Sequence, residues 1–153
     1  MSGTTKIRPT VVVAEDNHMM SARLQLLLAP YCELVAAVED GNALVSAARK
    51  HRPQVIVSDI DMPAMTGLEA ARIILAEQPE VRIVFVTALQ DAEIIRAALS
   101  LGALGYVGKR DVGQELLAAI DSSLDGQIYV SSSGWNAFGR RLDQRVSWSN
   151  DEQ

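Results

Sequence analysis

Five short runs of apolar, largely β-branched residues recur along the chain, and longer segments with a different apolar spacing separate them. The runs cover residues 10–14, 34–38, 55–58, 83–87 and 104–107. Their apolar character is continuous rather than alternating, which is typical of strands that are buried on both faces of a parallel sheet. We therefore predict five parallel strands, with helices covering both faces of the sheet that they form.

The intervening segments place apolar residues three, four and seven positions apart, which is the spacing of one face of an α-helix. The five predicted faces are Met20, Leu24, Leu27 and Leu28; Leu44, Ala47, Ala48 and His51; Leu68, Ala71 and Leu75; Ile94, Ala97, Ala98 and Leu101; and Leu117, Ile120 and Leu124. Thr66 with Glu69 has the spacing of a helix-starting capping box, as does the weaker pair Asp111 with Gln114. This alternation of strands and helices predicts a doubly wound α/β fold.

The pattern changes after Gly126. Residues 127–130 fit a short extra strand or a turn, and three serines follow. Further along, Trp135, Phe138, Leu142 and Val146 have helical spacing, which indicates an amphipathic helix over about 133–145. Gly139 inside that stretch favours an irregular linker equally well. We therefore divide the chain into a domain of residues 7–125 and a linker or tail of residues 126–153.

Composition removes several classes of protein. The chain has 153 residues, of which 14 are basic and 19 acidic, and the resulting net charge of −5 argues against a nucleic-acid binder along its whole length. Its single cysteine, Cys32, offers neither an internal disulfide nor a zinc-binding pair. The N-terminus lacks the apolar core of a signal peptide, and no apolar run approaches the ~18 residues of a membrane span. We expect a cytoplasmic protein with no membrane contact.

Charged and hydroxyl side chains follow four of the predicted strands. Glu15 and Asp16 follow the first strand, Asp59 follows the third, Thr87 ends the fourth, and Lys109 comes two residues after the fifth. Ligands of open α/β sheets bind at the carboxyl ends of the strands, so we expect these side chains to meet there. The second strand ends in an acidic pair at positions 39 and 40, followed by a glycine, which we interpret as a solvated turn.

This set of side chains suits phosphoryl transfer. Three clustered carboxylates repel one another without a cation, and oxygen ligands are those that Mg²⁺ prefers. A carboxylate can also attack a phosphoryl group to form an aspartyl phosphate, and Asp59 follows the central strand. A magnesium ion, the Lys109 ammonium and the Thr87 hydroxyl would stabilise the negative charge of the transition state. We therefore interpret Asp59 as the nucleophile.

These residues resemble those of the receiver domain of bacterial two-component response regulators. The resemblance is carried by Glu15 and Asp16, the segment DIDMPAMTG at 59–67, Thr87 and Lys109, and it covers about residues 7–125. It implies a flavodoxin-like (CheY-like) sheet with strand order 2-1-3-4-5. It also implies that Asp59 accepts a phosphoryl group from a sensor histidine kinase. Such a domain is not an enzyme in the usual sense, although it assists its own phosphorylation and dephosphorylation.

The resemblance further implies the ligands of the Mg²⁺ ion. The carboxylates of Asp16 and Asp59 and the backbone carbonyl of Asp61 hold the ion, and Glu15 contacts it through water. Glu15 stands where the family more often has aspartate, and a water molecule can bridge the extra methylene group. His18, just past the acidic pair, is interpreted as a solvated residue of the first helical turn rather than a metal ligand.

The roles of the remaining site residues are implied in the same way. Thr87 and Lys109 engage the phosphoryl oxygens, and Tyr106 matches the family's switch aromatic, which turns inward as Thr87 moves toward the phosphate. Arg110 departs from the pattern, because the family often has a proline after this lysine. That proline usually sets a cis peptide bond, so its replacement leaves the geometry of this loop open.

Residues 102–109 and 126–131 are similar to the LuxR/NarL-type subclass, whose members carry a helix-turn-helix output domain after the receiver. Residues 131–153, 23 positions in all, are too few for such a domain. We interpret the chain as the receiver of a longer transcription factor that contacts DNA only through that absent domain, with a stand-alone receiver as the alternative. We expect phosphorylation to promote a homodimer, through either the fourth helix, fifth strand and fifth helix or the first and fifth helices.

Two other functions match part of the same pattern. Asp59 and Asp61 also match the DxD motif of haloacid-dehalogenase-type phosphatases, but Pro63 replaces the usual threonine or valine and the motif follows the third strand rather than the first. A pseudo-receiver that has lost phosphorylation would lack one of the acidic residues or the lysine. All of them are present here, and Arg110 is the one feature in its favour.

Overall fold

Strands and helices alternate along the chain in the order that the apolar pattern predicts. The computed structural model describes residues 8–88 and 91–133. The strands are β1 (Thr10–Ala14), β2 (Glu33–Val38), β3 (Val55–Ser58), β4 (Arg82–Thr87), β5 (Gly105–Gly108) and β6 (Tyr129–Val130). The helices are α1 (His18–Leu28), α2 (Gly41–His51), α3 (Gly67–Glu77), α4 (Ala92–Leu101) and α5 (Val112–Leu124), with a short 3-10 turn, η2 (Lys109–Asp111), before α5.

The strands form one parallel sheet with the order β2-β1-β3-β4-β5-β6. The order 2-1-3-4-5 is therefore confirmed, and β6 is the short extra strand that the sequence allows at residues 127–130. β6 adds to the edge because Tyr129 N donates to Leu104 O at 2.8 Å and Ser131 N donates to Tyr106 O at 2.9 Å. These bonds use backbone groups of β5 that an open sheet edge would leave without partners.

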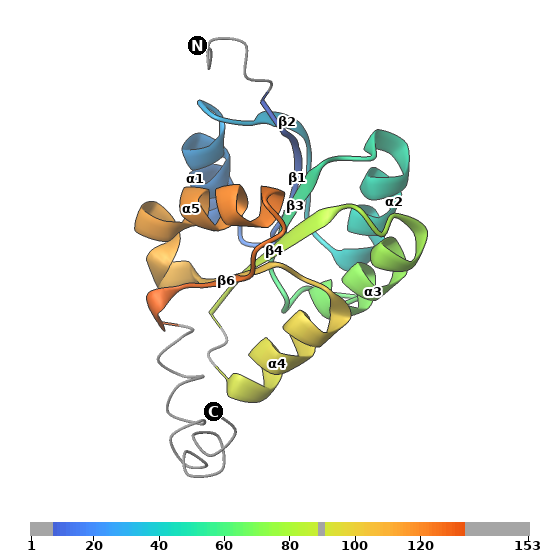
Figure 1. Ribbon diagram of the computed structural model, residues 1–153. Helices are drawn as coiled ribbons and strands as arrows, with labels where there is room; N and C mark the ends of the chain where they lie inside the picture. The colour runs from blue at the N-terminus through green and yellow to red at the C-terminus, as the bar shows by residue number, and fades with distance from the viewer. Residues whose placement is uncertain (1–7, 89–90, 134–153) are drawn as a thin grey trace.

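Helices cover the two faces of the sheet separately, as Figure 1 shows. α1 and α5 pack on one face and α2, α3 and α4 on the other. Successive side chains of β1 therefore enter different clusters: Val11 and Val13 belong to the cluster on the side of α1 and α5, and Val12 and Ala14 to the cluster on the side of α2, α3 and α4. Both faces of the central strands are buried, which confirms the interpretation of the continuous apolar runs.

The predicted face of α4 is confirmed at Ile94, Ala98 and Leu101, which lie in or against the core, but not at Ala97. The buried residues are Ala92, Ile95 and Ala98, whereas Ala97, which was expected to face the core, is exposed. Apolar residues occupy most positions of this helix, so its sequence permits two neighbouring faces. Packing against the sheet selects the one that contains Ile95.

Helix starts test the capping predictions. The capping box of α3 is confirmed, since Glu69 N donates to Thr66 Oγ1 at 3.1 Å and Thr66 N donates to Glu69 Oε1 at 2.9 Å. Asp111 makes no such cap for α5, because its carboxylate accepts hydrogen bonds from Ser131 and Ser133 instead.

The acidic pair after β2 lies in the bend that leads into α2, where Glu39 is exposed and Asp40 is half-buried. Asp40 is the N-cap of α2 and accepts a hydrogen bond from Ala43 N at 2.7 Å. Glu39 is exposed, and its Oε2 lies 3.2 Å from Nε2 of the exposed His18, which agrees with the solvated position expected for His18.

The C-terminal tail and the absence of a membrane span are two further expectations. The helix or linker proposed for 133–145 lies outside the described residues except at its first position. Within the part of the chain that the structure describes, no helix is both long and apolar enough to cross a bilayer.

Candidate functional site

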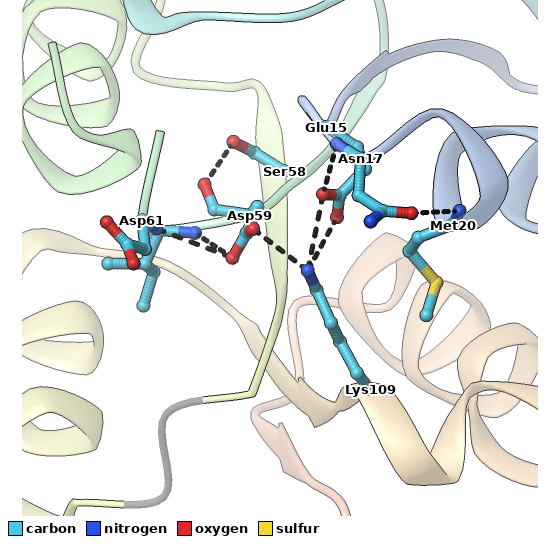
Figure 2. Close-up of polar contacts among 8 residues, drawn as sticks. Glu15, Asn17, Met20, Ser58, Asp59, Asp61 and Lys109 are labelled. Atoms are coloured by element: carbon cyan, nitrogen blue, oxygen red, sulfur yellow. Dashed lines mark hydrogen bonds and ion pairs between the residues drawn. The ribbon is translucent and has the colours of Figure 1, made fainter. Parts of the chain in front are cut away.

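The site lies at the carboxyl ends of β1, β3, β4 and β5. Glu15 follows β1, Asp59 follows β3, Thr87 ends β4, and Lys109 follows β5. Because these strands are parallel, their carboxyl ends meet at one edge of the sheet. Figure 2 shows the side chains of Glu15, Asp59 and Lys109 pointing toward one another from three separate strands.

Lys109 joins the two buried carboxylates. Its Nζ lies 3.1 Å from Asp59 Oδ2, and it lies 3.1 Å and 3.2 Å from Oε1 and Oε2 of Glu15. The contact with Oε2 has the geometry of a hydrogen bond, whereas Oε1 is buried with an ion-pair contact alone. The Lys109 side chain is 24% exposed and therefore reaches the carboxylates from the partly open side of the site.

Asp59 is held in one orientation by its own backbone surroundings. Ile60 N donates to Asp59 Oδ1 at 2.7 Å, and Asp61 N makes a longer contact of 3.4 Å with the same oxygen. The buried hydroxyl of Ser58 donates to the Asp59 carbonyl at 2.7 Å. These bonds occupy Oδ1 and turn Oδ2 toward Lys109.

Glycine is required where α3 begins beside this loop. A Cβ atom on Gly67 would collide with the Asp59 carbonyl oxygen, and Gly67 N donates to Ile60 O at 2.8 Å. The backbone of α3 therefore packs directly on the residue that carries the central carboxylate.

Glu15 is fully buried, and its neighbours act on its pKa in opposite directions. Burial and the nearby charge of Asp59 raise the pKa of Glu15, whereas the hydrogen bond from Asn17 N, at 3.0 Å, and the Lys109 ammonium lower it; the net shift is upward. Burial lowers the pKa of Lys109, but the hydrogen bonds and charges of Asp59 and Glu15 outweigh it and raise that pKa. Lys109 is therefore a stable ammonium ion.

The acidic residues also satisfy the chemistry of a hard divalent cation. One carboxylate oxygen each from Glu15, Asp16 and Asp59 lies within 4.8 Å of the others, and Asp16 is exposed at the mouth of this cluster. Oxygen-only ligands with an open side suit Mg²⁺, which retains several water molecules. The buried Glu15 Oε1, which has no hydrogen bond, adds a further acceptor to the set. The residues present thus fit the ion.

Asp61 and the two switch candidates have distinct positions. The Asp61 side chain is exposed, and the metal role of its carbonyl stays a prediction. Thr87 is fully buried at the end of β4, in register with Gly108 of β5. Tyr106 is also fully buried, within the core that contains α4. Burial, with the charges of Asp91 and Asp59, raises the pKa of the Tyr106 hydroxyl. The ring therefore has the inward orientation.

Three contributors to the site were not found from the sequence. Asn17 supports Glu15 through its N–H and also caps α1, accepting a hydrogen bond from Met20 N at 2.9 Å. An asparagine before the first helical face is a capping signal that could have identified it. Ser58 and Ser131 have no comparable signal, because a lone serine beside a strand is common.

Comparison with known proteins agrees with this geometry. The model of the response regulator receiver domain family matches residues 11–121. The chain is 30% identical over 122 residues to the transcriptional regulatory protein DegU of Brevibacillus brevis, covering 78% of this chain and 52% of DegU. It is 30% identical over 123 residues to the response regulator GacA of Pseudomonas aeruginosa, covering 79% of this chain and 58% of GacA. The chain therefore spans little more than half the length of these curated relatives.

A solved structure extends the similarity to the fold. The LuxR-family two-component response regulator of an Aurantimonas species superposes with a TM-score of 0.83 at 25% identity, covering 92% of this chain and 99% of that one. Sequence family, strand order and site geometry lead to one conclusion: the chain belongs to the response regulator receiver domain family and is homologous to regulators of the LuxR/NarL type.

Proposed function

We propose that Asp59 is the phosphoacceptor of this receiver domain and that a sensor histidine kinase donates the phosphoryl group. The observation that carries the proposal is the convergence of Asp59, Glu15 and Lys109, from three strands, within 3.2 Å of one ammonium nitrogen. A lone surface carboxylate has no need of this arrangement. A nucleophilic carboxylate needs it, because the carboxylate must stay ionised while the negatively charged phosphoryl group approaches.

The transfer follows from the orientation of Asp59. Oδ1 is occupied by backbone N–H groups, so Oδ2 attacks the phosphorus of the phosphohistidine. An O–P bond forms and the P–N bond breaks; its electron pair stays on the imidazole nitrogen, which then takes a proton. The Lys109 ammonium, 3.1 Å from Oδ2, is placed to stabilise the charge that spreads over the phosphoryl oxygens.

The acidic cluster is assigned to Mg²⁺. The carboxylates of Asp16 and Asp59 and the backbone carbonyl of Asp61 would hold the ion, with Glu15 acting through water. When bound, the ion supplies positive charge that offsets the repulsion between the carboxylates and the phosphoryl oxygens. Thr87 would move to donate its hydroxyl to a phosphoryl oxygen, and Tyr106, buried in the core that contains α4, would respond to that movement of Thr87.

The output is proposed from the relatives. DegU is named a transcriptional regulatory protein and GacA a response regulator, and this chain matches only part of each. We propose that phosphorylation of this cytoplasmic receiver, residues 7–125, switches a homodimer. Residues 126–153 would then lead toward an output domain that regulates transcription by binding DNA.

Uptake of a phosphoryl group from a small acyl phosphate tests the proposal. Wild-type protein with Mg²⁺ should gain one phosphoryl group by intact mass, and Asp59→Asn should gain none. Asp61→Asn is the matched control, because the proposal uses only the backbone of Asp61, and it should be labelled like wild type. Chelation of Mg²⁺ should slow labelling severely. A wild-type protein that stays unlabelled would identify a pseudo-receiver, and steady turnover of phosphate esters would identify a phosphatase.

A further inference from the structure

The residues that follow α5 are tied back to the loop that carries Lys109. We call residues 129–133 the return segment. Ser131 is fully buried, and its hydroxyl accepts a hydrogen bond from Gly108 N at 2.9 Å and donates one to Asp111 Oδ2 at 2.6 Å. Ser133 donates to the same Oδ2 through its hydroxyl at 2.6 Å and its N–H at 3.0 Å. A Cβ atom on Gly108 would collide with the Ser133 hydroxyl, so the contact is close.

A second carboxylate holds the return segment independently. Glu115, in the first turn of α5, accepts hydrogen bonds from the Tyr129 hydroxyl at 2.7 Å and from Ser132 N at 3.1 Å. These bonds fix the segment to α5 but do not reach Gly108 or Lys109. Besides the backbone bonds between β6 and β5, two sets of side-chain bonds therefore hold the return segment, one through Asp111 and one through Glu115. Of these two sets, only the one through Asp111 reaches the loop that carries Lys109.

Lys109 lies between two positions that Ser131 anchors. Gly108, immediately before it, donates a hydrogen bond from its N–H to the Ser131 hydroxyl, and Asp111, two residues after it, accepts a hydrogen bond from that hydroxyl. Residues Lys109–Asp111 form a single 3-10 turn, so little chain separates these anchors from the Lys109 backbone. Its side chain in turn reaches Asp59 at 3.1 Å. The bonds to the return segment therefore hold the Lys109 backbone where its side chain reaches Asp59.

We propose that Ser131 and Asp111 are positioning residues for Lys109, and that they couple the return segment to the state of Asp59. The proposal rests on the function assigned to Asp59 above. When Lys109 turns from Glu15 toward a phosphoryl group, the hold on the return segment changes. By thermodynamic reciprocity, loss of that hold changes the affinity of the site for a phosphoryl group by the same factor. The segment that leads toward the C-terminus thereby senses phosphorylation directly.

Two variants and a matched control separate this coupling from simple attachment. Ser131→Ala and Asp111→Asn break the link to the loop, and Glu115→Gln loosens the same segment without touching the loop. The probe is beryllofluoride with Mg²⁺, a stable phosphoryl analogue. Its dissociation constant and the exchange rates of the amide protons of Gly108, Ser131, Ser132 and Ser133 are measured for each protein.

In wild type, we expect beryllofluoride to change amide exchange at Gly108 and Ser131 several-fold. Ser131→Ala and Asp111→Asn should abolish that response and raise the dissociation constant by about fivefold or more. Glu115→Gln should speed exchange at Ser132 yet keep the wild-type dissociation constant. Unchanged affinity in both loop variants, or a loss of affinity as large in Glu115→Gln, would overturn the coupling.

A measurement on the ligand-free protein tests the positioning of Lys109 separately from the function proposed for Asp59. The ¹³Cε resonance of Lys109 in the ligand-free protein should shift in Ser131→Ala and Asp111→Asn and stay unchanged in Glu115→Gln. If wild type binds no beryllofluoride, the function proposed for Asp59 fails, and this resonance still decides whether the two residues position Lys109. If wild type binds the analogue but the resonance is unmoved in every variant, the positioning role fails alone.

Discussion

At the scale of single residues, the contact between Gly67 and the Asp59 carbonyl predicts a costly substitution. Gly67→Ala places a Cβ atom against backbone that cannot move without displacing Asp59. We expect unfolding free energy to fall by about 1–3 kcal/mol, as for other overpacked sites, and labelling by acyl phosphate to slow. Urea unfolding measures the first effect and intact mass the second.

Gly113→Ala is the matched control. Gly113 is an exposed residue in the first turn of α5, and a Cβ atom added there meets only the flexible end of the Arg23 side chain. Alanine favours a helix over glycine by ~1 kcal/mol, so this variant should be as stable as wild type or more so. Equal losses of stability in the two variants would contradict the account of Gly67.

Ala64 carries backbone strain in the loop between β3 and α3. Its φ is 69°, in the left-handed region, and Met65 N donates across it to Pro63 O at 2.7 Å. The strain of a left-handed L-residue is ~1–2 kcal/mol, and the extra freedom of an unfolded glycine offsets part of it. We expect Ala64→Gly to raise unfolding free energy slightly and Ala64→Val to lower it.

Ala97→Gly supplies the opposite case, because Ala97 is an exposed residue inside α4. It should lower unfolding free energy by ~1 kcal/mol, the usual cost of glycine in a helix. If glycine lowers stability equally at both positions, the left-handed conformation of Ala64 stores no strain.

The sequence predicts the central residues of the site because strand order places them. It does not predict their hydrogen-bond partners, because those depend on the local backbone conformation. Asp59 and Lys109 directly follow buried strands, so strand order alone places them at one edge. Glu15 and Asp16 are adjacent in sequence, yet one is fully buried and the other exposed. Whether each side chain points into the site or into solvent depends on the backbone conformation just after β1, which the residue types alone do not specify. The bond from Asn17 N to Glu15 depends on the same local turn.

At the scale of elements, β6 and the return segment depend on two carboxylates with lowered pKa. Burial opposes the shift of Asp111, but hydrogen bonds from Ser131 and Ser133 outweigh it and lower its pKa below the ordinary 3.8. Hydrogen bonds from Tyr129 and Ser132 likewise lower the pKa of Glu115 below 4.5 against its burial. The native state therefore binds fewer protons than the unfolded state, and their stabilisation is complete only above these ordinary values.

We expect this stabilisation to disappear as pH falls through the native pKa of each carboxylate. The double variant Asp111→Asn, Glu115→Gln should be less stable than wild type near neutral pH, and the difference should shrink below about pH 4. Urea unfolding of both proteins at a series of pH values measures it. A stability difference that stays constant with pH would show that the ionised forms contribute nothing.

Element-scale prediction from the sequence succeeds where both faces of a strand are buried. The strands of the sheet centre are apolar throughout and were placed within a residue of their bounds. α4 has apolar residues around most of its surface, so its core face was not determined by spacing. β6 has only two residues, and its pairing depends on hydrogen bonds to β5 that no periodicity encodes.

At the scale of the whole molecule, the net charge of −5 is concentrated in part at one edge of the sheet. If Mg²⁺ binds only the native state, a Mg²⁺ concentration of 100 times the dissociation constant should stabilise that state by up to about 3 kcal/mol. The melting temperature should rise accordingly. Asp16→Asn should reduce this rise in melting temperature sharply. Glu80→Gln, which removes an exposed carboxylate elsewhere, should keep it. Equal rises in all three proteins would place the ion outside the cluster.

Locating the phosphoryl group tests the central claim most directly. Wild-type protein is treated with acyl phosphate and Mg²⁺, the acyl phosphate bond is reduced with borohydride, and the reduced residue is mapped by peptide mass spectrometry. We expect reduction at Asp59 and at no other carboxylate. Reduction at Glu15, Asp16 or Asp61, or no reduction in a protein that has gained a phosphoryl group, would contradict it.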